Sequence, residues 1–354
     1  MASDRIPFSE AVHAQPASLA TAVAHIDSSL AEAELTPWRS GETVAILAMG
    51  ASTNSAHAFV TALAQHGIRA ANLTASEVAA YPSRFEPGDH YVIVTESGRS
   101  PEPIEAALTR GVGRRIAITN FPDASISSVA DHSIGYGGID DSPVYTAGYL
   151  STLVAYAAVM NKMGVASGFD PASAPAIVES ALERFAPVAA SLAGCFDRIT
   201  DADLIGRGFS YCSAAQGALI FREALRLAAT GWETYQFVHG PLESLGKNSL
   251  LVVLGDGREL DVVPQVAKAG VEVIVLSAAP DDRLSELAAI GANVHTVSLA
   301  HTSPGFERTI AETVLLQLLT EAVAARQGIT IEEFLYSQPD TKIPRPGESE
   351  EAGG

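Results

Sequence analysis

The stretch VAILAMGASTNSA at residues 44–56 decides the fold, because its pattern recurs as DLIGRGFSYCSA at residues 203–214. In each copy an apolar run ends at a glycine turn that carries serines, and a helical pattern follows. This strand–turn–helix unit is typical of the start of a βαβ crossover. Two copies, about 158 residues apart, predict two packed α/β units, each with its own parallel sheet.

The repeat continues along the chain, since VIVTESGR at 92–99 is answered by VVLGDGR at 252–258. The first unit is expected to have strands near 43–49, 69–73, 90–95, 114–119 and 133–136, and helices near 53–66, 101–111 and 145–163. The second is expected to have strands near 203–207, 249–254, 271–277 and 293–298, and helices near 211–229, 259–269, 282–290 and 305–327. This alternation predicts an α/β fold of two doubly wound parallel sheets flanked by helices, each a flavodoxin-like three-layer sandwich.

The remaining segments frame these two units. Residues 1–41 have a helical pattern that we expect to break once near Pro16. The first unit is then assigned to 42–165, a helical connector to 166–200, the second unit to 201–328 and a tail to 329–354. The tail is rich in Pro, Gly and Glu, and its last eight residues are expected to be mobile.

Composition excludes several classes of function. Of all residues 47% are hydrophobic and 18% charged, which is typical of a compact globular chain. The net charge of −19 predicts that neither nucleic acid nor a membrane surface is a partner. Two cysteines, Cys195 and Cys212, give no disulfide framework, and the polar N-terminus lacks a signal peptide's apolar run, so we expect a cytoplasmic protein. Because no motif has metal-ligand or nucleotide-binding spacing, no metal or cofactor is expected.

Two turns of the first unit are candidates for contact with a ligand. They are GASTNS at 50–55 and TESGRSP at 95–101, and both follow predicted strands. Hydroxyls and free amides at helix N-termini bind anions, although the same residues also serve as ordinary helix caps. Two such turns at equivalent strand ends favour an anion site. In the second unit Asp256 and Glu259 replace Ser97 and Ser100, so the anion site is expected in the first unit.

The second unit instead carries acid–base candidates. Glu223 lies in the helical pattern after the GRG turn, and His239 begins an HGP loop. Groups of this kind could transfer a proton and open a sugar ring. Spacing alone leaves the alternative that Glu223 is a surface residue and His239 part of a simple turn.

Taken together, these motifs resemble the sugar isomerase (SIS) domain family, in the tandem arrangement of the isomerase half of glucosamine-6-phosphate synthase. The similarity covers nearly all of residues 1–345. It includes the AQPASL lead-in, the two hydroxyl-rich turns, the GRG turn and the HGP loop, and QGALIFRE at 216–223 stands where relatives have EGALKLKE.

The resemblance implies a site shared between two subunits. Residues implied to contact the sugar or its phosphate are Gly50, Ser52, Thr53, Thr95, Glu96, Ser97, Gly98, Ser100 and Tyr145. Glu223 would move a proton between C1 and C2. His239 would assist ring opening from the partner subunit, and Lys342 would close over the sugar, so the resemblance implies a homodimer. Glu96 stands where many relatives have Gln, and Tyr145 where they have small residues, which indicates altered specificity.

The resemblance leaves several reactions open. We expect a small-molecule sugar or sugar phosphate as the substrate of an aldose–ketose isomerase, or of an amino-sugar-phosphate isomerase or deaminase. Because no glutaminase domain precedes the pair in this sequence, the synthase reaction itself is not expected. A fructosamine-type deglycase and a non-catalytic sugar-phosphate-binding regulator are the alternatives. Transcription regulators with such domains usually carry an N-terminal helix-turn-helix of about 80 residues, which the first 41 residues cannot supply.

Overall fold

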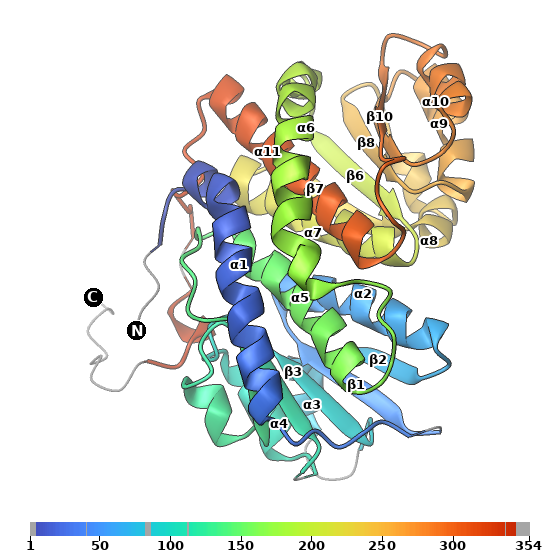
Figure 1. Cartoon of the computed structure of the whole chain (residues 1–354). Helices are drawn as coiled ribbons and strands as arrows, with labels where there is room; N and C mark the ends of the chain where they lie inside the picture. Colours follow the sequence, from blue (N-terminus) through green and yellow to red (C-terminus); the bar gives the residue numbers. More distant parts are fainter. Residues whose placement is uncertain (1–4, 40, 82–85, 112, 337, 345–354) are drawn as a thin grey trace.

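The structure is a computed structural model that describes residues 5–344, apart from residues 40, 82–85, 112 and 337 (Figure 1). The last eight residues of the chain, for which mobility is expected, lie outside the described residues.

Two five-stranded parallel sheets form the framework of the molecule. The front sheet has the order β2 (Arg69–Thr74), β1 (Thr43–Ala48), β3 (His90–Val94), β4 (Arg115–Thr119) and β5 (His132–Gly135). The rear sheet has the order β7 (Ala228–Glu233), β6 (Asp201–Gly206), β8 (Ser249–Leu254), β9 (Glu272–Ser277) and β10 (Val294–Ser298). Numbered within its own unit, each sheet therefore follows the flavodoxin-like order 2-1-3-4-5. The predicted fold class is confirmed.

Four long helices lie between the two sheets (Figure 1). They are α2 (Gly50–Gln65), α5 (Ala147–Lys162), α7 (Phe209–Leu225) and α11 (Phe306–Gln327). A single apolar cluster joins these helices to the inner faces of both sheets, with Ile46 on β1 and Val252 on β8 among its members. Alternate residues along each strand point to the opposite face. The core therefore runs through both units without interruption.

The outer face of each sheet is covered by shorter helices. On the front sheet, Leu47 and Ile93 pack in a second cluster beneath α3 (Ala75–Ala80) and α4 (Pro101–Leu108). On the rear sheet, Val253 and Val275 pack in a third cluster with α8 (Thr234–Val238), α9 (Val263–Lys268) and α10 (Asp281–Ala288). The short 3-10 segment η5 (Arg258–Asp261) precedes α9, so the helix expected at 259–269 is divided.

The N-terminal helix differs from its prediction. Helix α1 (Phe8–Glu32) continues through Pro16 without a break, and it packs against α5 and α6 (Ala174–Leu192). An interior proline removes one backbone hydrogen bond. Burial along the whole helix outweighs that loss, since Val12 and Leu19 on either side of the proline are fully buried. Next to the proline, Gln15 Nε2 donates to Gln317 Oε1 of α11 at 2.6 Å.

Strand β7 is absent from the sequence-based prediction, which placed a helix over 211–229. Helix α7 ends at Leu225, and Arg226 then adopts a left-handed conformation with φ 56°. Alanines at 228 and 229 favour a helix locally, so the helical pattern continues past its true end. Gly231 allows β7 to lie close to α7, because a Cβ there would come within 2.5 Å of Ala215 Cα.

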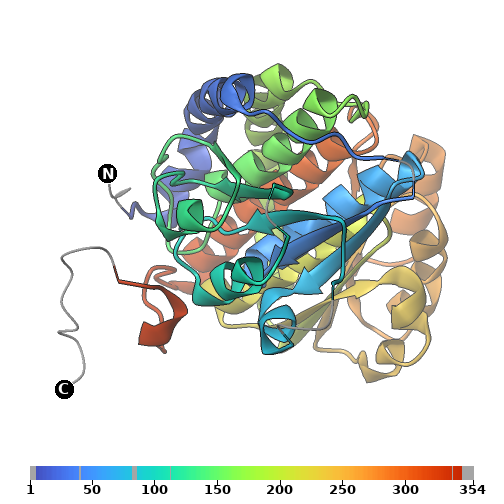
Figure 2. The ribbon, with the colours of Figure 1, turned by 90° about the horizontal axis from the view of Figure 1, so that it is seen from below.

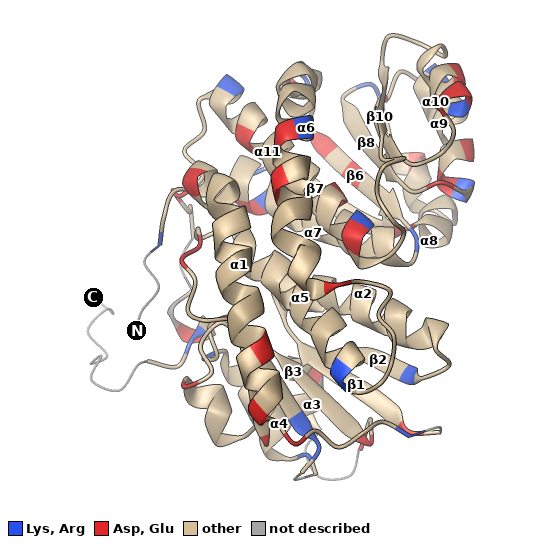
Figure 3. Ribbon diagram, viewed as in Figure 1, with Lys and Arg blue, Asp and Glu red and all other residues tan. Residues whose placement is uncertain are grey.

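Charge is dispersed on the face seen in Figure 3, where acidic positions are scattered over α1, α6 and α10 between uncharged stretches. Among the described residues, no helix combines the length and apolarity that crossing a membrane requires.

Candidate active site

The site lies where the front sheet reverses its winding direction. The sheet grows in one direction from β1 to β2 and in the opposite direction from β3 to β5. The turns that follow β1 and β3 therefore diverge and leave a crevice between them. The first turn leads into α2 at Gly50, and the second runs from Thr95 to Ser100 before α4. A cavity of about 250 Å³ lies between them.

Small hydroxyl side chains form the floor of this cavity. Thr95 and Ser97 are only 3% and 6% exposed. Thr95 Oγ1 donates to Ser100 Oγ at 3.4 Å, and Ser97 Oγ accepts from the Arg99 amide at 3.2 Å. Gly98, with φ 63°, makes this turn possible, because a Cβ there would lie 2.6 Å from Ala124 Cβ.

Three helices begin at the cavity wall. The first turns of α2, α4 and α5 contribute Ala51, Pro103 and Gly148 to its lining. Helix N-termini carry a partial positive charge and free amides, which together attract anions. The arrangement therefore suits an anionic group on a small ligand.

The opposite wall belongs to the rear unit. Gln216, Leu219 and Glu223 lie on one face of α7 and line the same cavity as the front turns. Their spacing of three and four residues is that of one helical face. Burial raises the pKa of Glu223 to about 7, since its carboxylate is removed from water. A carboxylate with that pKa can both accept and return a proton at neutral pH.

Both ends of the described chain meet over the cavity at Tyr145. Lys342 Nζ donates to the Tyr145 hydroxyl at 3.1 Å, and Arg5 Nη2 donates to it at 3.0 Å. The Arg5 guanidinium also lies 4.9 Å from the centre of the Tyr145 ring. The tail is held by the Ile343 amide, which donates to the Arg99 carbonyl at 2.8 Å. Figure 2 shows this C-terminal segment beside the front unit.

Asp141 positions the loop that carries Tyr145. The fully buried carboxylate accepts from the amides of Ser142 (2.8 Å) and Gly148 (2.7 Å) and from Thr146 Oγ1 (2.6 Å). Burial raises the pKa of Asp141 to about 6, although these hydrogen bonds oppose the shift. Its role is to hold Tyr145 and the start of α5 in place.

Glu96 adds an acidic group to the cavity wall. Its Oε1 accepts from Asn120 Nδ2 at 3.1 Å, and the carboxylate also interacts with the Tyr145 hydroxyl and with the positive charge of Arg5. Burial and the adjacent Glu96 charge raise the pKa of the Tyr145 phenol above its ordinary value. The cavity thus holds an acid close to a turn that suits an anion.

The structure brings most of the expected residues together. Those lining the cavity are Gly50, Ser52, Thr95, Glu96, Ser97, Ser100, Tyr145, Glu223 and Lys342. Thr53, Gly98 and His239 are not part of this lining. Thr53 lies on α2, where its carbonyl accepts from Asn72 Nδ2 at 2.8 Å, and Gly98 shapes the turn. His239 caps the C-terminus of α8 and is exposed.

Sequence reasoning missed Arg5 and Asp141. Arg5 has no motif around it, because its contact with Tyr145 spans the whole first unit. Asp141 had a signal in DSPVYT, where an acidic residue precedes hydroxyl side chains and a helix start.

Comparison with known proteins identifies the family of one part of the chain. Residues 199–322 match the model of the SIS domain family. An isomerizing glutamine–fructose-6-phosphate aminotransferase from Gloeobacter violaceus is 26% identical over 255 residues, which are 67% of this chain and 41% of that protein. Its counterpart from Methanothermobacter thermautotrophicus is 25% identical over 201 residues, which are 54% of this chain and 34% of that protein. The chain thus spans less than half the length of these curated relatives.

Solved structures share the fold of most of the chain. The C-terminal domain of glucosamine-fructose-6-phosphate aminotransferase from Francisella tularensis has a TM-score of 0.75 and 21% identity, covering 91% of this chain and 96% of that one. Glucosamine-6-phosphate deaminase from Thermotoga maritima has a TM-score of 0.68 and 18% identity, covering 92% and 96%. Tagatose-6-phosphate ketose/aldose isomerase from Escherichia coli has a TM-score of 0.70 and 17% identity, covering 97% of each chain.

These findings place an SIS domain within an α/β protein. Residues 199–322 belong to the SIS domain family, and the two sheets share one strand order, so the recognised resemblance is confirmed at the level of family and fold. That the first unit is a second SIS domain in tandem stays a prediction, as do the expected domain boundaries.

Proposed function

We propose that the protein is a sugar-phosphate isomerase or an amino-sugar-phosphate isomerase or deaminase. One observation carries the proposal: Glu223 from the rear unit lines the same cavity as the hydroxyl-rich turns of the front unit. The family match and the names of the similar proteins, which include a phosphosugar isomerase and an amino-sugar-phosphate deaminase, support this class of reaction.

The front wall of the cavity binds the phosphate of the substrate, and the rear wall transfers the proton. Ser52, Ser97 and Ser100 hold the phosphate at the helix N-termini, which leaves the sugar carbons directed toward Glu223. Glu223 removes a proton from one carbon beside the carbonyl or imine. The electron pair forms an enediol or enolamine, and the same proton returns to the neighbouring carbon. In the deaminase branch, water then hydrolyses the imine and ammonia leaves.

The groups at the cavity mouth stabilise charge during this transfer. Lys342, held against Tyr145, places a positive charge over the substrate and lowers the energy of the developing oxyanion. Ring opening needs a further acid or base, and His239 is exposed outside the cavity of its own chain. We therefore assign that step to the His239 of a second subunit in a homodimer.

Glu96 favours the amino-sugar branch of the proposal. Its carboxylate lines the cavity beside Tyr145 and Arg5, and a carboxylate on the wall repels a second anion. A substrate ammonium group would form further charge-assisted hydrogen bonds with this carboxylate. The fructosamine-type deglycase remains the second candidate, because its adduct also carries an amine that Glu96 could bind.

Ligand screening followed by an exchange measurement tests the reaction class. Hexose and hexosamine 6-phosphates are first ranked by the rise in melting temperature that they cause. Solvent deuterium incorporation at C2 is then followed by NMR for the ligands that stabilise the protein. Binding without exchange would exclude proton-transfer catalysis and leave the regulator.

Removal of the proposed base sharpens the test. Glu223→Gln should keep ligand-induced stabilisation but lower the exchange rate by about 10²-fold or more. Asp203→Asn is the matched control, since burial also raises the pKa of this β6 carboxylate, which does not line the cavity. Equal rates in the two variants would remove Glu223 as the base.

Two further measurements address the amine and the shared site. Glu96→Gln should weaken binding of hexosamine phosphates relative to hexose phosphates, and an unchanged ratio would contradict the amino-sugar branch. Mixing inactive Glu223→Gln and His239→Ala proteins should restore part of the activity, because one site of a mixed dimer is intact. No recovery after subunit exchange would contradict a shared site.

A further inference from the structure

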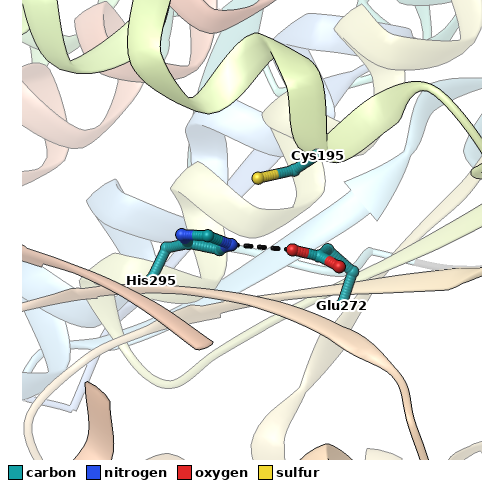
Figure 4. A group of neighbouring side chains, drawn as sticks. All are labelled: Cys195, Glu272 and His295. Atoms are coloured by element: carbon teal, nitrogen blue, oxygen red, sulfur yellow. Dashed lines mark hydrogen bonds and ion pairs between the residues drawn. The ribbon is translucent and has the colours of Figure 1, made fainter. Parts of the chain in front are cut away.

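Three side chains outside the cavity converge at one end of the rear sheet (Figure 4). They are Cys195, Glu272 and His295, and their sulfur, carboxylate oxygen and imidazole nitrogen all lie within 4.8 Å of one another. In Figure 4 the Cys195 sulfur points toward the gap between the other two groups. None of the three lines the cavity described above.

The fold explains how residues so far apart in sequence meet. Glu272 begins β9, and His295 lies on β10, where it pairs with Ile274 in the parallel register. Because side chains alternate along a strand, Glu272 lies two positions before Ile274 on the same face as His295. His295 Nε2 and Glu272 Oε1 are 2.7 Å apart. Cys195 comes from the 3-10 segment η3 (Ala193–Phe196), which follows α6.

We propose that Cys195, Glu272 and His295 form a binding site for a divalent transition-metal ion, with zinc as the best match. Thiolate, imidazole and carboxylate are three ligand types that zinc accepts in proteins, whereas magnesium and calcium prefer oxygen alone. Three protein ligands leave a fourth position of the tetrahedron for water.

Access and charge are suitable for an ion. His295 and Glu272 are 31% and 24% exposed, so the ion and its water can reach them from solvent. Asp197 lies near the Cys195 thiol but is paired with Arg326, so Glu272 supplies the negative charge for the ion. On binding, the thiol gives its proton to solvent and its sulfur bonds to the metal.

The geometry needs a small adjustment. With zinc–nitrogen and zinc–oxygen bonds of about 2.0–2.1 Å, two tetrahedral ligand atoms are about 3.3 Å apart. The His295–Glu272 contact must therefore open from 2.7 Å by about 0.6 Å, which side-chain rotation can provide. Neither strand has to shift.

A bound ion would act as a structural clip. It would join the segment after α6 to β9 and to β10, which is an edge strand of the rear sheet. Edge strands are the parts of a sheet most open to fraying and to unwanted pairing. The ion would stabilise the rear unit without taking part in chemistry at the cavity.

Cobalt titration of the full chain tests the site directly. Chelator-treated protein in a reducing buffer is titrated with Co²⁺, which replaces zinc and reports thiolate ligation through a near-ultraviolet charge-transfer band. We expect saturation at one equivalent, loss of the band when Zn²⁺ is added, and a higher melting temperature with Zn²⁺. Absence of the band, or no saturation, would overturn the proposal.

Matched variants assign the ligands. Cys195→Ser should abolish the band, and His295→Gln should weaken cobalt binding at least tenfold while it keeps a hydrogen-bonding group beside Glu272. Cys212→Ser, at the other cysteine, should keep both the band and the Zn²⁺-induced rise in melting temperature. A band that survives in Cys195→Ser, or that disappears in Cys212→Ser, would also overturn it. If Cys195→Ser does not fold, as judged by circular dichroism, His295→Gln decides the outcome.

Discussion

The turn that follows β3 and the turn that follows β8 occupy equivalent places in the two units, but the contents of the two turns differ. In the front unit Ser97 and Ser100 border an open cavity. In the rear unit Glu259 folds back over its own turn, so that a Cβ at Gly255 would lie 2.0 Å from Glu259 Oε1. Asp256 is also engaged, since it accepts from Ser277 Oγ at 2.9 Å and pairs with Arg308.

The turns that follow β1 and β6 repeat this contrast. Ser210, the counterpart of Ser52, donates to the carboxylate of Glu312 at 2.8 Å. Glu312 is fully buried in α11, and burial raises its pKa to about 7. In the rear unit the positions equivalent to the front serine turns are therefore occupied by its own carboxyl groups. The front unit keeps these positions open, and the rear unit contributes Glu223 to the shared cavity instead.

The largest expected effect comes from removing the front hydroxyls. Ser97→Ala combined with Ser100→Ala should lower kcat/KM for the phosphorylated substrate by about 10²-fold or more, because two charge-assisted hydrogen bonds are lost. Ser210→Ala is the rear counterpart and should leave KM unchanged, with a small loss of stability. Steady-state kinetics of the three proteins measure the contrast, and equal KM values would mean that the front turn does not hold the phosphate.

Glu312 offers a test through pH. Its pKa rises from an ordinary 4.5 to about 7 on folding, so the folded state favours the neutral form. Stability from this group is fully present below pH 4.5 and is lost as the pH rises through 7, by about 3 kcal/mol. Glu312→Gln should remove this loss, so urea unfolding at pH 5 and pH 9 should differ less for the variant than for the wild type. If the stability of the variant and of the wild type changed equally with pH, the side chain of Glu312 would not be a neutral carboxyl group in the folded protein.

A glycine comparison probes the rigidity of the two turns. Gly98→Ala should destabilise the protein by about 2 kcal/mol or more, since φ is positive and the new Cβ would meet Ala124 at 2.6 Å. Gly257→Ala should cost less than about 1 kcal/mol, because its Cβ would make ordinary contact with Glu259 at 3.4 Å. Thermal unfolding ranks the two variants, and the reverse order would show that the front turn is the more adaptable.

The smallest expected effect concerns the cavity mouth. Arg5→Gln should raise KM by about two- to fivefold with little change in kcat, because an exposed charge near a binding site contributes modestly. Arg69→Gln, an exposed arginine on β2, is the control. The effect should shrink at high ionic strength. A tenfold or larger loss in kcat would place Arg5 in the chemistry itself.

Secondary-structure elements and turns that local patterns determine could be predicted from the sequence. Elements and residues whose placement depends on tertiary contacts could not. The repeated glycine–serine turns follow apolar strands, so the sheets and most of the cavity wall could be recognised in advance. Strand β7 was missed because its alanines favour a helix locally, whereas packing against α7 stabilises a strand there. Arg5 and the group formed by Cys195, Glu272 and His295 depend on segments that are distant in sequence and meet only on folding, so no spacing rule detects them. The contacts of Asp141 are local, and its signal in DSPVYT was overlooked.

The meeting of Arg5 and Lys342 on one tyrosine hydroxyl has a practical consequence for work with this protein. An affinity tag or fusion partner joined close to Arg5 or to Lys342 would lie beside the mouth of the cavity. Binding constants measured on such a protein would then report the appendage as well as the cavity. An internal surface loop remote from Tyr145 is the better place for a label.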